Sequence, residues 1–235
     1  MRYAILAAGE GSRLHHEGIA VPKPLVTVAG ETLIDRLIRI FMKNGAEKIS
    51  VICRSEQQVV HHLQQCQHAG LPIEFMVRDT PSSMHSFYEL TNIMDADLPF
   101  VVTTVDTIFK EEEFAAYLEA FLHMLKKREG DGLMGVTDYI DDEKPLYVKT
   151  DDNQGILAFL DNDEQPKYVS GGIYGLTPTS LTTLNACILR GESRMRNFQR
   201  ALLADRMRLK AWLFTKVLDI DHAGDIAKAE KFLST

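Results

Sequence analysis

Two glycines and a basic side chain stand directly after an apolar run at the start of the chain. The run 3–8 is predicted to be a buried strand, and it leads into Gly9, Gly11 and Arg13. Glycine lets the backbone adopt positive φ and lets a ligand approach without a Cβ in the way. Successive backbone N–H groups in such a turn form a concave anion site, to which Arg13 adds a positive charge. The spacing favours a phosphate-binding loop made of Leu6, Ala7, Ala8, Gly9, Glu10, Gly11, Ser12 and Arg13.

Two familiar phosphate-binding loops and one hydrolase motif do not fit this stretch. The dinucleotide-binding fingerprint requires a third glycine three residues after the second, and that position is Leu14. The P-loop of many nucleoside triphosphatases requires Gly-Lys-Ser/Thr, which does not follow Gly11. A Gly-x-Ser-x-Gly nucleophile elbow is also missing from the sequence. Hydride transfer and ordinary ATP hydrolysis are therefore disfavoured.

Acidic side chains follow two further apolar runs that are predicted to be strands. Asp106 comes directly after the run 98–105, and Asp219 and Asp221 follow the run 208–218. Open parallel sheets bind ligands at the carboxyl ends of their strands, so we expect these carboxylates near the glycine loop. Mg²⁺ prefers oxygen ligands and is typically held by one or two carboxylates plus substrate phosphates. The sequence predicts a Mg²⁺–nucleotide site, with Asp219 or Asp221 as the second metal ligand beside Asp106.

Other candidate metal ligands are better explained without a metal. The pairs His15–His16 and His61–His62 are adjacent and project differently, and no His/Cys cluster has the spacing of a transition-metal site. The acidic stretches 141–143, 151–153 and 161–164 lack the spacing of an EF-hand. We interpret these stretches as solvated turns.

The order of the apolar runs indicates an α/β fold. Up to residue 77 it is strand, helix, strand, helix, strand, which favours a parallel sheet with right-handed crossovers. Shorter strands separated by acidic turns follow, and this pattern is typical of short antiparallel strands joined by exposed turns. We expect a single domain over 1–235: a three-layer α/β/α sandwich with a mostly parallel, Rossmann-like sheet and a small antiparallel substrate-side extension. Strands are predicted at 3–8, 48–53, 72–77, 98–105, 132–139, 146–150, 155–160, 168–176 and 208–218, and helices at 32–44, 55–69, 86–94, 111–128, 177–189, 195–206 and 224–233.

The bulk composition excludes several classes of function. Apolar residues make up 45% of the 235 residues and charged residues 25%, as in ordinary globular proteins. The net charge of −7 argues against a nucleic-acid-binding face, and the apolar runs are too short to span a bilayer. The three scattered cysteines, with no signal-peptide pattern at the start, are typical of a cytoplasmic protein. We expect any homo-oligomer to form through this domain itself.

Several motifs together resemble the sugar-phosphate nucleotidyltransferase family. The glycine loop followed by Pro22-Lys23-Pro24-Leu25 is similar to the family's signature. The run 100–106 resembles its central strand ending in a metal-binding aspartate, 170–174 its substrate strand, and 219–225 its C-terminal metal motif. The resemblance covers essentially the whole chain. It implies the nucleotide-diphospho-sugar transferase fold, with a nucleotide-binding half at 1–130 and a substrate-binding half at 131–235.

The resemblance also implies roles for individual residues. The loop backbone and Arg13 would wrap the phosphates of a nucleoside triphosphate, and Lys23 would neutralise charge between the α-phosphate and the incoming phosphate. Asp106 and Asp219 would hold Mg²⁺, with Asp221 as the alternative second ligand. The stretch 80–86, with Ser82 and Ser83, lies where the family reads the base. The glycines of the substrate strand, Gly171 and Gly172, would let the substrate lie against that strand.

The implied reaction joins a nucleoside triphosphate to a sugar 1-phosphate and releases pyrophosphate. The loop 81–86 lacks the glycine-threonine pattern of the hexose enzymes, which leaves the base and the sugar open. One alternative is a cytidylyltransferase for phosphocholine or another small alcohol phosphate, which would require an aromatic cage. Clustering of Tyr168, Tyr174, Phe159 or Trp212 at the substrate pocket would favour it. An alternative from another class is a non-catalytic nucleotide-binding regulatory module.

Overall fold

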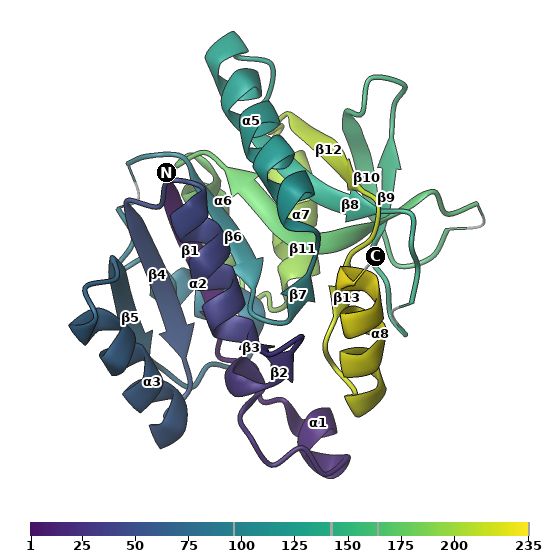
Figure 1. The fold of residues 1–235 in the computed structure, drawn as a ribbon. Coiled ribbons are helices and arrows are strands. Elements are labelled where there is room, and N and C mark those ends of the chain that lie inside the picture. Colours follow the sequence, from purple (N-terminus) through teal and green to yellow (C-terminus); the bar gives the residue numbers. More distant parts are fainter. Residues whose placement is uncertain (96, 142, 164, 235) are drawn as a thin grey trace.

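The first part of the chain alternates strands and helices, and its strands form the parallel part of one sheet (Figure 1). The computed structural model describes residues 1–95, 97–141, 143–163 and 165–234. The strands β4, β1 and β6 lie side by side in parallel, and β5 extends the sheet beyond β4. The elements of this part are β1 (Arg2–Ala7), α2 (Leu33–Lys43), β4 (Lys48–Cys53), α3 (Gln57–His68), β5 (Ile73–Val77), α4 (Ser83–Leu90), β6 (Phe100–Thr104) and α5 (Glu111–Lys127).

The second part of the chain extends the same sheet with antiparallel pairings. The long strand β11 lies antiparallel to both β6 and β8, while β12 lies parallel to β8. The resulting nine-stranded mixed sheet confirms the predicted α/β fold with its antiparallel extension. The elements of this part are β8 (Gly132–Thr137), β9 (Tyr147–Thr150), β10 (Ile156–Leu160), β11 (Tyr168–Leu176), α6 (Ser180–Leu189), α7 (Met195–Ala204), β12 (Leu209–Phe214) and α8 (Ala223–Leu233).

Six short elements connect the larger ones at the edge where the parallel strands end. They are α1 (Ser12–His16), the 3₁₀ turn η1 (Lys23–Leu25), the hairpin β2 (Thr27–Val28) and β3 (Glu31–Thr32), and the strands β7 (Thr107–Ile108) and β13 (Leu218–Asp219). The sequence pattern did not reveal these elements, because two to five residues are too few to show a hydrophobic period.

The alternation of side chains along β1 builds a separate core on each face of the sheet. Tyr3 and Ile5 pack with residues of α2, α3, α5 and α8, whereas Ala4 and Leu6 pack with residues of α4, α6 and α7. Successive side chains of a strand point to opposite faces, so an all-apolar strand requires cover on both. Helices accordingly lie on both faces of the sheet, which makes the three layers (Figure 1).

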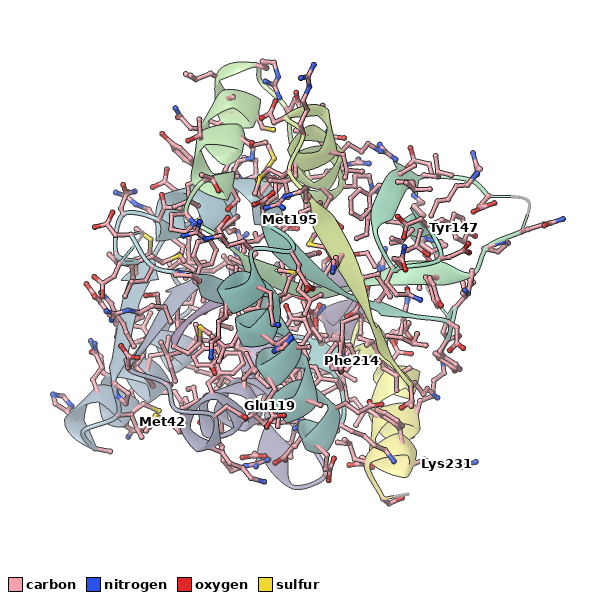
Figure 2. The ribbon with its side chains drawn as sticks, turned by 90° about the horizontal axis from the view of Figure 1, so that it is seen from above. Met42, Glu119, Tyr147, Met195, Phe214 and Lys231 are labelled. Atoms are coloured by element: carbon pink, nitrogen blue, oxygen red, sulfur yellow. The ribbon has the colours of Figure 1, made fainter. Side chains whose placement is uncertain are left out.

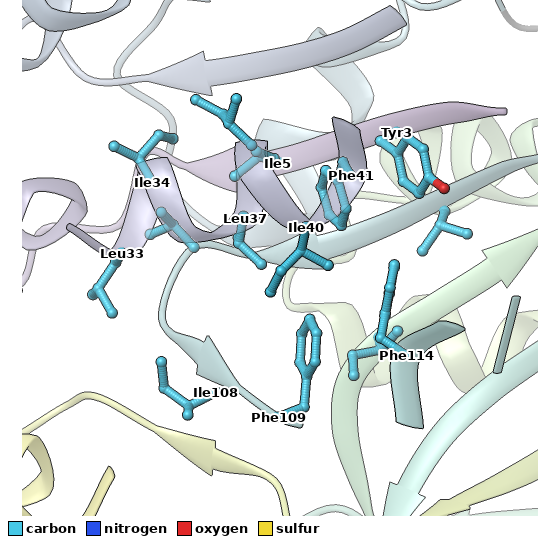
Figure 3. Close-up of a cluster of buried hydrophobic side chains, with 14 of the residues drawn as sticks. Tyr3, Ile5, Leu33, Ile34, Leu37, Ile40, Phe41, Ile108, Phe109 and Phe114 are labelled. Carbon is cyan, nitrogen blue, oxygen red and sulfur yellow. The ribbon is translucent and has the colours of Figure 1, made fainter. Parts of the chain in front are cut away.

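Stacked aromatic rings fill the core under α2 and α5. Tyr3 stacks on Phe41 with ring centroids 4.3 Å apart, and Phe109 stacks on Phe114 at 5.0 Å. Figure 3 shows Phe109, which directly follows Ile108, among these rings beside α2. The buried Arg36 of α2 donates to the carbonyl of Phe109 at 2.5 Å. These contacts fix the chain just after Asp106, and so they position the edge where the candidate site lies.

Apart from the buried Arg36, the described charged side chains of the covering helices are half-buried or exposed. Figure 2 shows Phe214 of β12 in the interior, whereas Glu119 of α5 and Lys231 of α8 lie on the surface. In the acidic stretch 151–153, Asp151 is exposed and accepts hydrogen bonds from the backbone of Asn153 and Gly155, as expected of a solvated turn. Two members of the other acidic stretches, residues 142 and 164, lie outside the described residues. Among the described helices, none has the length and apolar character needed to cross a bilayer.

Several predicted bounds differ from the structure by a few residues, and two of these differences matter for the site. The helix expected at 86–94 is α4, which begins at Ser83 because the Ser82 hydroxyl caps it and accepts from the backbone of His85 at 3.4 Å. The strand expected at 208–218 ends at Phe214, and a separate two-residue strand, β13, follows after a short turn. Both differences lie at the site edge, where local hydrogen bonding overrides the apolar pattern.

Candidate active site

The loop after β1 depends on glycine at one position. Gly11 is the N-cap of α1 and has φ 59°, in the left-handed region. A Cβ on Gly11 would lie 3.0 Å from the Cβ of Lys23, closer than such atoms normally approach. Glycine therefore serves two purposes here, because it permits the backbone angle and leaves room for the stem of Lys23.

Lys23 is buried between two carboxylates. It begins η1 after Pro22, its side chain is 8% exposed, and its Nζ forms ion pairs with Asp106 and with Asp221, the latter at 2.7 Å. Burial opposes the charge of Lys23, but the two carboxylates outweigh it and raise the pKa of the amine above its ordinary value. Burial likewise opposes the charge of Asp106, yet the Lys23 ammonium lowers the pKa of that carboxyl. Both groups are therefore charged at neutral pH.

A two-residue ladder brings the C-terminal carboxylates to Asp106. β7 directly follows Asp106 and pairs antiparallel with β13, which places Asp219 opposite Thr107. The Thr107 hydroxyl lies 3.4 Å from Asp219 Oδ1, and the backbone N–H of Ile220 donates to the Asp106 carbonyl at 3.2 Å. Asp221, two residues further on, then reaches Lys23 and also Arg13, whose Nη1 lies 3.0 Å from Asp221 Oδ2. Carboxylates more than a hundred residues apart in sequence thus meet at one edge.

A cavity of about 570 Å³ opens between the glycine loop, the carboxylates and the start of α4. Ala7 does not line it, because its side chain packs in the core under α2. Ser82 and Ser83 lie at the N-terminus of α4, on the wall facing the loop. The predicted residues that line this larger cavity are Leu6, Ala8, Gly9, Glu10, Gly11, Ser12, Arg13, Lys23, Ser82, Ser83, Asp106, Asp219 and Asp221.

Two lining residues were missed by the sequence analysis. Arg54 follows β4, and its guanidinium lies 3.7 Å from Glu10 and 3.6 Å from Asp79. Thr104, the last residue of β6, bonds the Thr107 hydroxyl at 2.6 Å. Both stand at the carboxyl end of a parallel strand. The same position in the sequence predicted Asp106 as a site residue, and it could have predicted these two residues as well.

A second cavity of about 240 Å³ adjoins the first and shares Arg13, Asp219 and Asp221 with it. The bulged strand β11 contributes Ser170 and Gly171 to its wall. Gly172 has φ 71° and does not line either cavity; a Cβ there would lie 3.0 Å from the Thr107 hydroxyl. The smaller cavity also includes three charged residues that the sequence analysis did not single out: Asp141, Glu143 and Lys228.

The aromatic residues considered for a cage do not gather at the smaller cavity. Tyr168, Tyr174 and Phe159 are at most 5% exposed and belong to the core under α4, α6 and α7. Trp212 lies on a different surface hollow, beside α5. Of the residues that line the smaller cavity, Tyr139 supplies the aromatic ring. The condition set for a quaternary-ammonium cage is therefore not met by these four residues.

Comparison with known proteins identifies the family. A profile of the nucleotidyl transferase family matches residues 3–234. The chain belongs to this family. A UTP–glucose-1-phosphate uridylyltransferase from Haloferax volcanii is 25% identical over 99% of this chain and 96% of its own length.

Two solved structures share the fold of this nucleotidyl transferase. A Bacillus anthracis structure in complex with sucrose has a TM-score of 0.84 at 20% identity and covers 99% of this chain and 94% of its own. The inositol-1-phosphate CTP transferase from T. maritima has a TM-score of 0.77 at 19% identity, covering 100% and 98%. At these identities the likeness shows the fold alone.

We expect Gly11→Ala to weaken triphosphate binding in this nucleotidyl transferase. The added Cβ crowds Lys23 and strains the backbone, so KM for the nucleoside triphosphate should rise about tenfold, with a stability loss of about 1–2 kcal/mol. Gly18→Ala is the matched control, because Gly18 has φ 90° but open space around its Cβ position. Steady-state kinetics and denaturant unfolding should show a stability loss in both variants and a higher KM in Gly11→Ala alone; equal KM values would contradict the crowding argument.

An ion pair ties the segment after α1 to the N-terminus of α8. Glu17 bonds His222 Nδ1 at 2.6 Å and accepts from the backbone N–H of Ala223 at 2.6 Å. Hydrogen bonding to Glu17 raises the pKa of His222, and the bond from His222 lowers the pKa of Glu17. Asp225 completes the capping box of α8 by accepting from the His222 backbone at 2.8 Å. The segment after α1 and the start of α8 are thereby joined.

This tie should weaken as the pH rises. A group whose pKa is raised on folding stabilises the fold fully below its unfolded pKa, about 6.5 for histidine, and loses that contribution above its folded pKa. We expect NMR titration to place the His222 midpoint above 6.5 and Glu17→Gln to move it back towards that value. Glu47→Gln, which removes a carboxylate paired with the amino terminus, should leave His222 unmoved. An unchanged midpoint in Glu17→Gln would contradict the assigned cause.

Proposed function

We propose that this nucleotidyl transferase is a Mg²⁺-dependent enzyme that joins a nucleoside triphosphate to a sugar 1-phosphate, giving a nucleotide-diphospho-sugar and pyrophosphate. The observation that carries the proposal is the convergence of Lys23 with the carboxylates at the junction of two cavities. The larger cavity has the volume and the glycine loop for a nucleoside triphosphate, and the smaller one is left for the acceptor. Any product must form where they meet, beside Lys23.

The residues at the junction fit a divalent cation. Asp106, Asp219 and Asp221 offer hard oxygen donors and outnumber the positive charges of Lys23 and Arg13. Such donors match the preference of Mg²⁺, which would supply charge neutralisation on the phosphates when bound. Asp106 and Asp219 are the proposed ligands, because Asp221 already pairs with both basic side chains.

The side chains of the site position charge rather than act as nucleophiles. An oxygen of the acceptor phosphate attacks the α-phosphorus, and the bond from that phosphorus to the bridging oxygen of pyrophosphate breaks. Lys23 is held charged and can neutralise the oxygens on which negative charge builds up. Arg13 lines both cavities and can contact phosphates from either substrate. Ser82 and Ser83 are the proposed contacts to the base, and Gly171 is the proposed backing for the acceptor.

Acceptor recognition is proposed to rest on carboxylates in the smaller cavity. Asp141, Glu143 and Ser170 line it, and carboxylates accept hydrogen bonds from sugar hydroxyls. The name of the Haloferax relative, a glucose-1-phosphate uridylyltransferase, supports a sugar phosphate. A second candidate acceptor is a small alcohol phosphate with an ammonium group, which the acidic lining and the small volume of about 240 Å³ favour. A purely regulatory module is not supported, since the family is one of enzymes and the charged groups converge.

The deciding experiment is a substrate matrix. Each of the four nucleoside triphosphates is incubated with Mg²⁺ and with sugar 1-phosphates, inositol 1-phosphate, phosphocholine and phosphoethanolamine, and pyrophosphate release is followed. We expect one base and one acceptor class to dominate. Turnover confined to the ammonium compounds would replace the sugar assignment, and no pyrophosphate from any pair would contradict the proposed function.

We expect Glu143→Gln to act on the acceptor and not on the triphosphate. Glu143 lies 3.9 Å from Arg13 and 3.8 Å from His222 at the mouth of the smaller cavity. Loss of one charge-assisted hydrogen bond should raise KM for an ammonium acceptor roughly 10–100-fold, but for a sugar only a few-fold, because the amide oxygen still accepts from a hydroxyl. Glu192→Gln, whose carboxylate pairs with Arg190 outside both cavities, is the control. A rise in KM for the triphosphate alone would show that Glu143 acts on the triphosphate, and it would contradict the proposed role of Glu143 in acceptor binding.

A further inference from the structure

Three metal-ligating side chains of different chemistry meet away from the nucleotide cleft. Asp35 lies in the first turn of α2, and His62 and Cys66 lie on α3. One ligand atom from each lies within 4.8 Å of the others. His62 and Cys66 are four residues apart, so they share one face of the helix. In the sequence His62 stands directly beside His61, and this adjacent pair hides the i, i+4 spacing of His62 and Cys66.

The carboxylate of this group is already oriented by a partner of its own. Asp35 Oδ1 lies 2.7 Å from His62 Nε2, while Asp35 Oδ2 accepts from the Thr32 hydroxyl at 2.6 Å. Thr32 is also the N-cap of α2, where its hydroxyl accepts from the Asp35 backbone. Metal ligands are commonly held by such outer hydrogen bonds, which fix their direction before the ion arrives.

We propose that Asp35, His62 and Cys66 form a binding site for a zinc-like divalent transition metal. A thiolate, an imidazole and a carboxylate are the three ligand types that Zn²⁺ uses, and a water molecule can complete a tetrahedron. Mg²⁺ prefers oxygen ligands alone, so this group is distinct in chemistry from the carboxylates of the cleft. All three residues are partly exposed, which gives an ion access.

The geometry gives such an ion a structural role. The buried residues of α3 are Val59 and Leu63, so only a small apolar surface of this helix packs against the core beside the edge strand β5. A metal bound by Asp35 from α2 and by the other two ligands from α3 would link the edge helix to the central one. Because metal binding selects the folded state, it should raise the thermal stability of the protein.

Cobalt titration of the full-length, reduced protein tests the site, with Mg²⁺ in excess to occupy the carboxylates of the cleft. We expect a thiolate-to-cobalt charge-transfer band that saturates at one equivalent and is displaced by Zn²⁺. His62→Ala and Cys66→Ser should each weaken binding at least tenfold, and Cys66→Ser should abolish the band. His61→Ala is the matched control, because His61 bonds Gln65 outside the group and should leave the titration unchanged.

Thermal unfolding gives a second readout that does not involve activity. Zn²⁺ should raise the Tm of the wild type and of His61→Ala, and raise it much less in the two ligand variants. Absence of the thiolate band in the wild type, or an equal affinity in Cys66→Ser, would overturn the proposal. Neither result would bear on the proposed nucleotidyl transfer, which depends on a different group of residues.

Discussion

Lys23→Ala is expected to lower kcat for pyrophosphate release by about a thousandfold, because it removes a preorganised positive charge from the junction of the two cavities. The Lys23 side chain is 8% exposed and its amine is held between two carboxylates, so water cannot easily replace it. Single-turnover measurements at saturating substrates would separate this effect on the chemical step from an effect on binding. A rate within a few-fold of the wild type would show that Lys23 does not stabilise the transition state.

A second variant separates the catalytic loss from a loss of stability. Removal of one partner of a buried charge pair leaves the other uncompensated, and Lys23→Ala should therefore lower the free energy of unfolding by about 3 kcal/mol. Asp106, whose side chain is 18% exposed, is the carboxylate left behind. In the double variant Lys23→Ala/Asp106→Asn this charge is removed as well. We expect the double variant to regain most of the stability and none of the activity.

Asp106→Asn alone is expected to lower kcat by about a thousandfold or more, because it removes the proposed metal ligand nearest to Lys23. Asparagine has the same shape, and Lys23 keeps its ion pair with Asp221, so the variant should fold. We expect the dependence of the rate on Mg²⁺ concentration to shift to much higher values, while equilibrium binding of the nucleoside triphosphate changes little. The measurement is the initial rate across a Mg²⁺ series.

Asp131→Asn is the matched control for that series. Asp131 is also an ion-paired aspartate at the start of a strand, but its partner is Arg208, outside both cavities. Its replacement should leave the Mg²⁺ dependence as in the wild type. If both variants lost activity to the same degree, a general loss of folded protein would explain the result and Asp106 would have no assigned role.

The glycine loop and the layer arrangement could be predicted because their causes are local. An apolar strand such as β1 must bury both of its faces, which requires helices above and below the sheet. The turn at Gly11 requires a residue that tolerates positive φ, and a glycine at this position of the sequence indicates such a turn. Asp106 could be identified for a similar reason, since it stands at the end of a strongly apolar run and such strand ends gather at one edge.

Which acidic residues meet, and how, depended on contacts between distant segments. The ladder between β7 and β13 places Asp219 opposite Thr107 and lets Asp221 reach Lys23, but two residues per strand carry no pattern that a sequence can display. The predicted start of α4 was wrong for a related reason. The helix begins where the Ser82 hydroxyl caps it with a single hydrogen bond, and such a bond leaves no hydrophobic periodicity in the sequence. Gly172, predicted to lie beside the substrate, lines neither cavity, and a Cβ there would lie 3.0 Å from the Thr107 hydroxyl.

The sequence by itself determined the fold class, the family resemblance and the position of the glycine loop, whereas the tertiary structure decided the shape and charge of the smaller cavity. Asp141, Glu143 and Lys228 stand in unremarkable polar turns and a surface helix, and they become neighbours through the folding of separate elements. Asp35 and the α3 pair His62 and Cys66 meet in the same way. Periodicity and turn chemistry act over a few residues, but a site is made where chain segments far apart in sequence come within a few ångströms of each other.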